Sequence, residues 1–295
     1  MRIYVSGASG FVGSHVAREL RERGAEVHDE RIDLLDRTGL EHAVEGCEAV
    51  VHVAALYSYD ARPELIEQVN VEGTRNLLEA AARRGVRRFV HTSTAGTCGP
   101  VPGRPATEDD APPAWELSVP YKRTKLAAER LALEAGAVVV NPTTPVGEGD
   151  RKPTPTGRMI AGVATGHIRG YVATTGLNVV DVRDVARGHA LALERGDPGE
   201  RYLLGGADLA LEDLFAAVAG LAGRPRPRLR VPYAVALAAS KAGIVNPDEV
   251  KLARLPMYFS WEKARSRLGY APGPVEPALA RAVAEALSRN GKGGA

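Results

Sequence analysis

The segment Tyr121-Lys-Arg-Thr-Lys125 holds a phenol and an amine four residues apart. We expect it to lie on a helix that starts near Pro120 and ends near Gly136, so that both side chains project from one face. A nearby ammonium favours the phenolate and lowers the tyrosine pKa from about 10 towards a value useful for proton transfer. The pair therefore predicts an acid/base at Tyr121, although a tyrosine four residues before a lysine is also common by chance.

A hydroxyl that could serve the same chemistry lies in His91-Thr-Ser-Thr94, at the end of an expected strand that begins at Arg88. Thr94 could hold a carbonyl or alcohol oxygen of a substrate while Tyr121 transfers the proton. Ser93 is the alternative donor. Together these side chains suggest proton transfer at a ketone or a secondary alcohol.

The first residues of the chain contain a candidate cofactor-binding turn. Residues 3–5 indicate a short buried strand, Gly7, Gly10 and Gly13 indicate a turn, and apolar residues then recur at helical spacing up to Leu20. Because glycine has no Cβ, backbone N–H groups and the helix N-terminus can approach a pyrophosphate. The spacing G-x-x-G-x-x-G differs from the general G-x-G-x-x-G fingerprint, so taken alone it also fits a plain tight turn.

The choice between NAD and NADP depends on the end of the second expected strand, residues 25–31. An acidic side chain there would bind the ribose hydroxyls of NAD, whereas an arginine would accommodate the 2′-phosphate of NADP. Counting forward from the glycine turn places Arg31 at this position, and counting backward from residues 32–36 places Asp29 or Glu30 nearer. The forward count favours NADP slightly. A solvated charge at Arg31 is the alternative.

Further strands and helices alternate along the chain and predict a doubly wound parallel sheet. The strand that begins at Glu48 ends in Ala54 and Ala55, whose small side chains leave room for a ligand across the sheet edge. Residues 63–84 form one long expected helix, and residues 95–113 form a loop long enough to be a functional flap.

The second half of the chain changes in character, with many prolines and glycines after residue 147. We assign residues 1–147 to a dinucleotide-binding core that is completed by a strand and helix in residues 177–195. Residues 148–176 and 196–295, including an expected strand over 201–205, form a smaller substrate-binding lobe. The last residues, 290–295, lack apolar side chains to bury and are expected to be disordered.

Composition excludes several classes of function. The 295 residues carry a formal charge of +2 with mixed signs, which argues against nucleic acid or a membrane surface as the main partner. Cys47 and Cys98 are too few for a disulfide framework and have no neighbours at metal-ligand spacing, so we expect no metal. Met1 leads directly into the first expected strand, and no apolar run approaches the ~20 residues that span a bilayer. These features predict a cytoplasmic protein.

The order of the glycine turn, the Ser/Thr strand end and Tyr-x-x-x-Lys resembles the short-chain dehydrogenase/reductase superfamily. Asn70-Val-Glu-Gly-Thr74 is similar to the extended branch, the NAD-dependent epimerase/dehydratase family, in which this asparagine supports the active site from behind. Asn141-Pro-Thr-Thr-Pro-Val-Gly147 and Glu200-Arg-Tyr-Leu-Leu-Gly-Gly206 look like the hopanoid-associated sugar epimerase group, which is related to dihydroflavonol 4-reductases. Asp181-Val-Arg183-Asp184 departs from these relatives, which tend to have a His or Tyr followed by two aspartates.

This resemblance implies a Rossmann-type fold and a set of site residues. It favours Thr94 over Ser93 and gives Lys125 a second role, binding the cofactor ribose. The catalytic residues that it implies are Thr94, Tyr121 and Lys125. The cofactor-binding residues that it implies are Gly7, Ser9, Gly10, Phe11, Val12, Gly13, Arg31, Asp33, Leu34, Ala54, Ala55, Tyr121, Lys125 and Pro142.

The resemblance also implies hydride transfer between NADP or NAD and a small-molecule substrate, in a possible homodimer. Two reactions share this first step: net reduction of a ketone, and transient oxidation of a nucleotide sugar by tightly bound NAD in an epimerase or dehydratase. Arg31 favours net reduction of a ketone. The second half of the chain favours transient oxidation of a nucleotide sugar. A non-catalytic protein that senses the cofactor is the third alternative, and retention of Tyr121 and Lys125 counts against it.

Overall fold

A six-stranded parallel sheet forms the centre of the larger half of the molecule. The computed structural model describes residues 1–56 and 62–292, with side chains to residue 290. The strands follow the order β2-β1-β3-β4-β5-β9, and every neighbouring pair is parallel. Their bounds are β1 Arg2–Ser6, β2 Glu26–His28, β3 Ala49–His52, β4 Arg88–Thr92, β5 Val138–Pro142 and β9 Arg201–Leu204. The central strands are β-branched runs buried on both faces, as expected for a parallel sheet between two helical layers.

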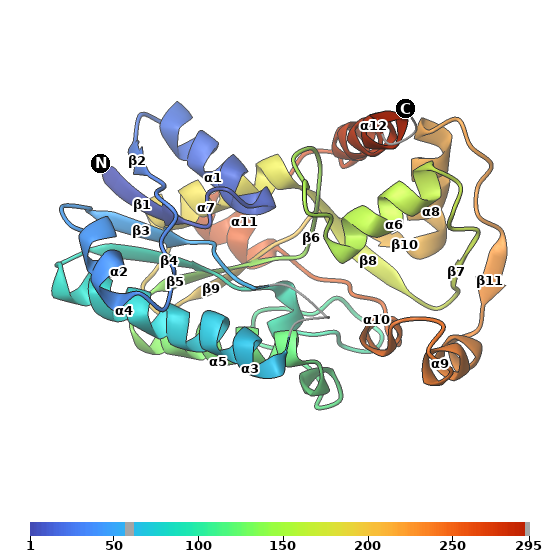
Figure 1. Ribbon diagram of the computed structural model, residues 1–295, viewed down its shortest axis with the longest axis horizontal. Helices are drawn as coiled ribbons and strands as arrows, with labels where there is room; N and C mark the ends of the chain where they lie inside the picture. The colour runs from blue at the N-terminus through green and yellow to red at the C-terminus, as the bar shows by residue number, and fades with distance from the viewer. Residues whose placement is uncertain (57–61, 293–295) are drawn as a thin grey trace.

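Helices cover both faces of this sheet (Figure 1). One layer comprises α1 Phe11–Glu22, α7 Val182–Arg195 and α11 Glu262–Leu268. The other comprises α2 Arg37–Ala43, α3 Pro63–Glu67, η1 Gln68–Glu72, α4 Gly73–Arg83 and α5 Pro120–Glu134. This arrangement confirms the predicted doubly wound Rossmann-type fold, and it brings the carboxyl ends of the strands, the N-terminus of α1 and the start of α5 to one edge.

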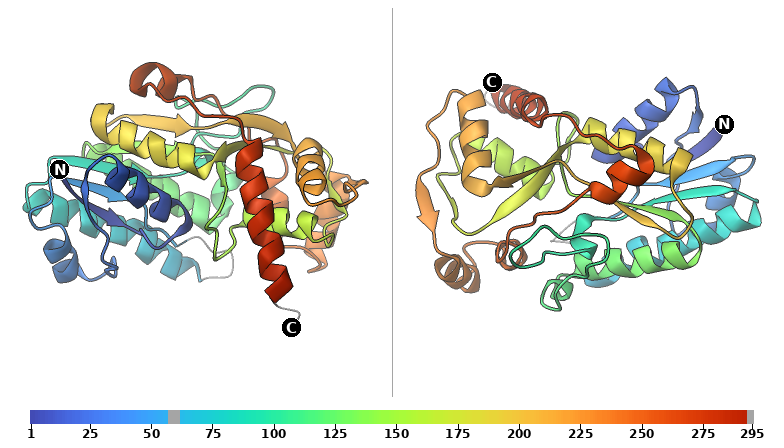
Figure 2. Two further views of the ribbon diagram at one scale, coloured as in Figure 1. Left: turned by 90° about the horizontal axis from the view of Figure 1, so that it is seen from above. Right: turned by 180° about the vertical axis from the view of Figure 1, so that it is seen from behind.

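The smaller lobe is built on two short sheets (Figure 2). The first has the order β10-β8-β6, with bounds Ala207–Ala210, Gly176–Asp181 and Thr144–Val146, and the second pairs β11 Leu229–Val231 with β7 Gly170–Val172. Its helices are α6 Pro155–Ala164, α8 Leu211–Leu221, α9 Tyr233–Lys241, α10 Pro247–Leu252 and α12 Glu276–Lys292. A separate apolar core that includes Ile160, Phe215 and Leu279 holds α6, α8 and α12 together.

The structure corrects two strand assignments. The strand expected to complete the core, near residues 177–182, is β8 and pairs with β6 and β10 in the lobe. The strand expected in the lobe, near residues 201–205, is β9 and pairs with β5 in the large sheet. Helix α7 does pack against α1 of the core. Sequence pattern failed here because both segments are short, buried and apolar, and only tertiary pairing distinguishes them.

Three element boundaries also differ from expectation. The helix predicted over 63–84 contains a π-helical turn, η1, between α3 and α4. Strand β2 has only three residues, because most of the predicted segment 25–31 is polar and exposed. Residues 290–292, expected to be disordered, continue α12.

The loop at residues 95–113 is anchored to the fold. Ala106 pairs with Phe259 through a β-bridge, and Arg201 donates hydrogen bonds to the carbonyls of Glu108 and Asp110. Among the described residues, no helix is both long and apolar enough to cross a membrane.

Candidate active site

The glycine turn joins β1 to α1 by a path that side chains would obstruct. Gly7 has φ +75°, and a Cβ there would lie 2.6 Å from the Ala54 nitrogen. A Cβ on Gly13 would lie 2.1 Å from the Gly7 carbonyl oxygen. Gly10 is the N-cap of α1 and has no side chain to occupy the free N–H groups. This cradle of backbone N–H groups at a helix N-terminus fits a cofactor pyrophosphate.

The other residues predicted around this turn lie where β1 and β3 end. Ser9 and Ala55 are exposed, and Phe11, Val12 and Ala54 are half-buried. The Ala54 N–H donates to Ser6 Oγ at 3.3 Å, which ties the end of β3 to the end of β1. The backbone at residue 54 therefore lies close to the glycine turn.

Beyond β2, the three charged residues that bear on cofactor choice differ in their partners. The Asp29 carboxylate accepts a hydrogen bond from Arg21 at 2.7 Å. Arg31 is exposed and has no ion-pair partner among the residues that the structure describes. The side chain of Glu30 is exposed too, and its backbone carbonyl lies 3.3 Å from the Tyr4 hydroxyl.

The neighbouring segment has a local structural role. Asp33 accepts from the Leu35 N–H at 3.0 Å, and Leu34 is buried against Gly73 of α4. A Cβ on Gly73 would lie 2.6 Å from the Leu34 Cβ, so the helix can approach this segment only with glycine there. These contacts fix the chain that follows the candidate cofactor-selecting residues 29–31.

Tyr121 and Lys125 lie on the first turns of α5, whose N-terminus contains Pro120 at a position that favours helix initiation. Lys125 is only 3% exposed, and its Nζ donates to the Thr92 carbonyl at 2.6 Å. Burial lowers the pKa of Lys125 to about 8, against the opposing effect of the Glu129 carboxylate. Tyr121 is half-buried one turn before it.

Both candidate hydroxyls lie just beyond β4. Thr94 is half-buried and caps the short helix η2, Ala95–Thr97, where its Oγ1 accepts from the Gly96 N–H at 3.3 Å. Ser93 Oγ is buried without a hydrogen-bond partner among the described residues. The more open position of Thr94 suits contact with a substrate, and the unpartnered hydroxyl of Ser93 leaves it as the alternative.

Asn70 connects the chain beyond β3 to α5, the helix that carries the tyrosine. It lies in η1 and is buried. Its side chain accepts from the Leu56 N–H at 2.7 Å and donates to the Leu56 carbonyl and to Thr124 Oγ1, both at 3.2 Å. The π-turn thus aims this amide at the chain beyond β3 and at α5.

The sequence analysis did not identify Glu129, a buried carboxylate that binds residues of three other elements next to the candidate site. It lies one turn after Lys125 and is 1% exposed. Arg201 of β9 donates to its carboxylate at 2.7 Å, and Asn141 of β5 does so at the same distance. Thr97 Oγ1 lies 2.6 Å from this carboxylate. The missed signal is the continued spacing of four residues from Tyr121 through Lys125 to a carboxylate.

This Glu129 cluster also holds the backbone of Thr94. The Asn141 amide donates to the Thr94 carbonyl at 3.2 Å, and Thr97 Oγ1 donates to it at 2.8 Å. Pro142, also predicted at the site, is the last, buried residue of β5 beside Asn141. The cluster therefore couples the positions of α5, β5 and the Thr94 hydroxyl.

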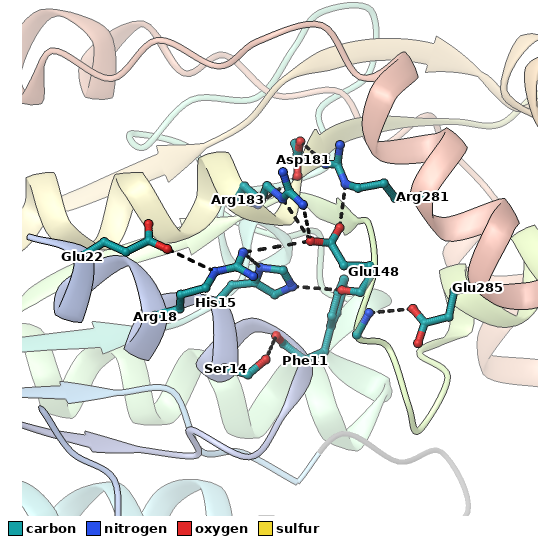
Figure 3. A network of polar contacts seen from close by, with 11 residues as sticks. Phe11, Ser14, His15, Arg18, Glu22, Glu148, Asp181, Arg183, Arg281 and Glu285 are labelled. Carbon is teal, nitrogen blue, oxygen red and sulfur yellow. Dashed lines mark hydrogen bonds and ion pairs between the residues drawn. The ribbon is translucent and has the colours of Figure 1, made fainter.

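A second polar cluster joins the core to the lobe (Figure 3). Glu148, which follows β6, accepts from Arg183 of α7 at 2.7 Å and from Arg281 of α12 at 2.6 Å. Its backbone carbonyl lies 2.9 Å from His15 Nε2 of α1. Burial raises the pKa of Glu148, but the arginine hydrogen bonds outweigh this effect and hold it at about 2. Arg183, the departure noted in the sequence, therefore has a partner of its own.

The described residues contain no group of three His, Cys, Asp or Glu side chains that could hold a metal ion. His52 is buried between Ser6 Oγ at 2.6 Å and Thr74 Oγ1 at 3.0 Å, and burial lowers its pKa to about 3. Such histidines are neutral and contribute to packing.

Comparisons with known proteins agree with this geometry. The sequence profile of the NAD dependent epimerase/dehydratase family matches residues 3–205. A Synechocystis protein that carries the name dihydroflavonol 4-reductase is 35% identical, covering 95% of this chain and 93% of its own. Sterol demethylase protein B of Methylococcus capsulatus is 32% identical, over 96% and 98%.

A solved structure extends the agreement to the whole fold. The crystal structure of a nucleoside-diphosphate-sugar epimerase from Pseudomonas aeruginosa superposes with a TM-score of 0.83 at 28% identity, covering 99% of this chain and 98% of that one. Reductases and dehydrogenases are among the similar sequences, and epimerases and dehydratases are among the similar structures. The chain belongs to the NAD dependent epimerase/dehydratase family, the extended branch of the short-chain dehydrogenases/reductases.

Proposed function

We propose that the protein is an NADPH-dependent reductase that converts a ketone to a secondary alcohol. The observation that supports this proposal lies at the end of β4, next to Thr94. There the buried Lys125, one turn after Tyr121 on α5, donates to the Thr92 carbonyl. The nicotinamide supplies the hydride when it is bound. Gly7, Gly10 and Gly13 would receive its pyrophosphate.

The chain's own residues would handle the oxygen and the proton. Thr94 Oγ1 and the Tyr121 hydroxyl would donate hydrogen bonds to the carbonyl oxygen, and the tyrosine proton would pass to that oxygen as negative charge develops on it. Lys125 would stabilise the tyrosinate that remains. Its link to the Thr92 carbonyl positions it for this role.

Arg31 supports the choice of NADPH. Its exposed guanidinium has no ion-pair partner among the described residues, whereas Asp29, a rival ligand for the NAD ribose, is paired with Arg21. A phosphate bound by Arg31 would gain a charge-assisted hydrogen bond. Glu30 is the residue that would favour NAD instead.

The family resemblance adds expectations about context: a cytoplasmic location and assembly as a homodimer. The second candidate reaction, transient oxidation of a nucleotide sugar by retained NAD, keeps the support of the solved epimerase structure at 28% identity. A cofactor-sensing protein without turnover is the third candidate.

One set of measurements separates these candidates. We expect purified protein to bind NADPH more tightly than NADH and to consume it with a ketone. Tyr121→Phe should lose turnover by about 10²–10⁴-fold while it keeps NADPH affinity. Arg31→Gln should weaken NADPH binding by about tenfold to a hundredfold and leave NADH binding unchanged. Tightly retained NAD would instead support the epimerase or dehydratase, and full turnover by Tyr121→Phe would contradict the mechanism.

A further inference from the structure

One stretch of the lobe, residues 221–245, differs from the rest of the surface, and we call it the lobe edge. It runs from the last residue of α8 through β11 and α9. Both the front and the rear view show it along the side of the lobe that faces away from the six-stranded sheet, in orange to brown in Figures 1 and 2. It is therefore remote from the glycine turn.

The charges of the lobe edge are all positive. Residues 221–245 contain no Asp or Glu, and their cations are Arg224, Arg226, Arg228, Arg230 and Lys241. Prolines alternate with Arg224, Arg226 and Arg228 and keep this segment extended. The whole chain has a net charge of only +2. The low net charge of the whole chain therefore conceals a local excess of positive charge at this edge, which can attract an anionic partner.

Acidic side chains flank the lobe edge, but they already have partners. Arg230 donates to Glu212 of α8 at 2.5 Å. On the α10 side, Glu249 pairs with Arg158 and Asp248 with Lys251. Arg224, Arg228 and Lys241 have no ion-pair partner among the described residues.

The same edge exposes large aliphatic side chains. Nine large hydrophobic residues are exposed among the residues that the structure describes, and five of them belong to this edge. They are Leu221, Leu229, Val235, Ile244 and Val245. Ile244 is 74% exposed and Leu229 is 64% exposed. Exposed aliphatic groups beside cations are the pattern of a surface that inserts shallowly into lipid headgroups.

Other occupants fit this chemistry less well. A second copy of the chain would bring like charges together if the edge paired with itself about a two-fold axis. The phosphates of a nucleic acid could bind the arginines. Its bases, however, stack on aromatic side chains, and the five exposed large side chains of this edge are aliphatic. The partner that matches both features is anionic and apolar at once.

We propose that the lobe edge binds the surface of an anionic lipid bilayer. The arginines would contact headgroup phosphates, and Ile244 and Val245 would enter the boundary of the acyl chains. The protein would lie on one leaflet without crossing it. This proposal stands independently of the reductase proposal, because none of its residues belongs to the candidate active site.

The test is co-sedimentation of the purified full chain with vesicles. Vesicles of phosphatidylcholine and phosphatidylglycerol should bind the protein at low salt, and pure phosphatidylcholine should not. Each cation near an anionic membrane contributes about fivefold to affinity. The triple variant Arg224→Gln/Arg226→Gln/Arg228→Gln should therefore bind about a hundredfold more weakly, and Ile244→Ser/Val245→Ser about tenfold more weakly.

Matched variants control for general effects of charge and hydrophobicity. Arg87→Gln removes an exposed cation from the larger half of the molecule, next to β4. Leu287→Ser removes an exposed aliphatic side chain from α12. Both should bind vesicles like the parent, and so should Tyr121→Phe. The proposal is overturned if the parent ignores the anionic vesicles, if the edge variants bind as well as the parent, or if the controls weaken binding equally. Self-association that Ile244→Ser/Val245→Ser abolishes, without vesicle binding, would likewise overturn it and indicate a protein interface.

Discussion

Glu129 and Glu148 each accept hydrogen bonds from an arginine and join elements that are distant in the sequence, yet their surroundings differ. The Glu129 side chain is 1% exposed beneath the candidate active site, and that of Glu148 is 29% exposed between core and lobe. Water screens the second cluster far more than the first. Similar ion pairs should therefore contribute differently to chemistry and to stability.

The buried cluster is coupled to a titrating group. Glu129 opposes the effect of burial on Lys125, one turn away, and its partners hold the Thr94 carbonyl. In the half-exposed cluster, Glu148 binds Arg183 and Arg281 from two helices, and within the described part of the chain no hydrogen bond joins it to Thr94 or Lys125. We therefore expect Glu129 to affect rate and pH dependence, and Glu148 to affect how the lobe is held.

The largest effect should come from Lys125→Met. This change removes the buried ammonium that we propose stabilises the Tyr121 phenolate, and we expect turnover to fall by about 10²–10⁴-fold. In the parent, kcat/KM for ketone reduction should fall as pH rises through about 8, where Lys125 loses its proton. Steady-state kinetics across pH would check both points. An unchanged rate in Lys125→Met would remove the link between the buried cluster and catalysis.

The next largest effect should come from Glu129→Gln. Loss of the carboxylate leaves Arg201 without its buried counter-charge, so the free energy of unfolding should fall by about 2–3 kcal/mol. The pKa of Lys125 should also fall, because the group that opposes burial is gone. The high-pH limb of kcat/KM should therefore move to lower pH.

Denaturant unfolding and the pH profile test this second prediction together. Glu134→Gln, an exposed position near the end of the same helix, is the matched control and should change neither quantity. A loss of stability without a shift of the pH limb would assign Glu129 a purely structural role.

The smallest effect should come from Glu148→Gln. With screening by solvent, we expect the free energy of unfolding to fall by about 1 kcal/mol, and high salt should reduce the difference from the parent. The pKa of Glu148 lies below its ordinary value, so its stabilisation is present above about pH 4.5 and is lost as pH falls towards 2. Urea unfolding at low and high salt would measure it. A loss of unfolding free energy as large as that of Glu129→Gln, or a shift of the high-pH limb of kcat/KM, would contradict the proposed difference between the two clusters.

Much of this protein could be predicted from local pattern. The glycine turn, the alternation of strands and helices, and the spacing of Tyr121 and Lys125 depend on residues close in sequence, and all predicted the fold. Asn70 was recognised by resemblance, and the structure shows it buried and bonded to the chain beyond β3. The roles of the candidate site residues remain predictions for the experiments above.

Other features required tertiary structure because they depend on pairing between distant segments. β8 and β9 are both short apolar strands, and their sequences do not say which sheet each one joins. Glu129 is significant only because Arg201 and Asn141, which lie 72 and 12 residues away in the sequence, reach it from two strands. The sequence by itself determined the fold class, the glycine turn between β1 and α1 and the helical spacing of Tyr121 and Lys125, since backbone propensity and helical spacing are local. Only the tertiary structure decided which charges are buried together, because burial is a property of the packed molecule.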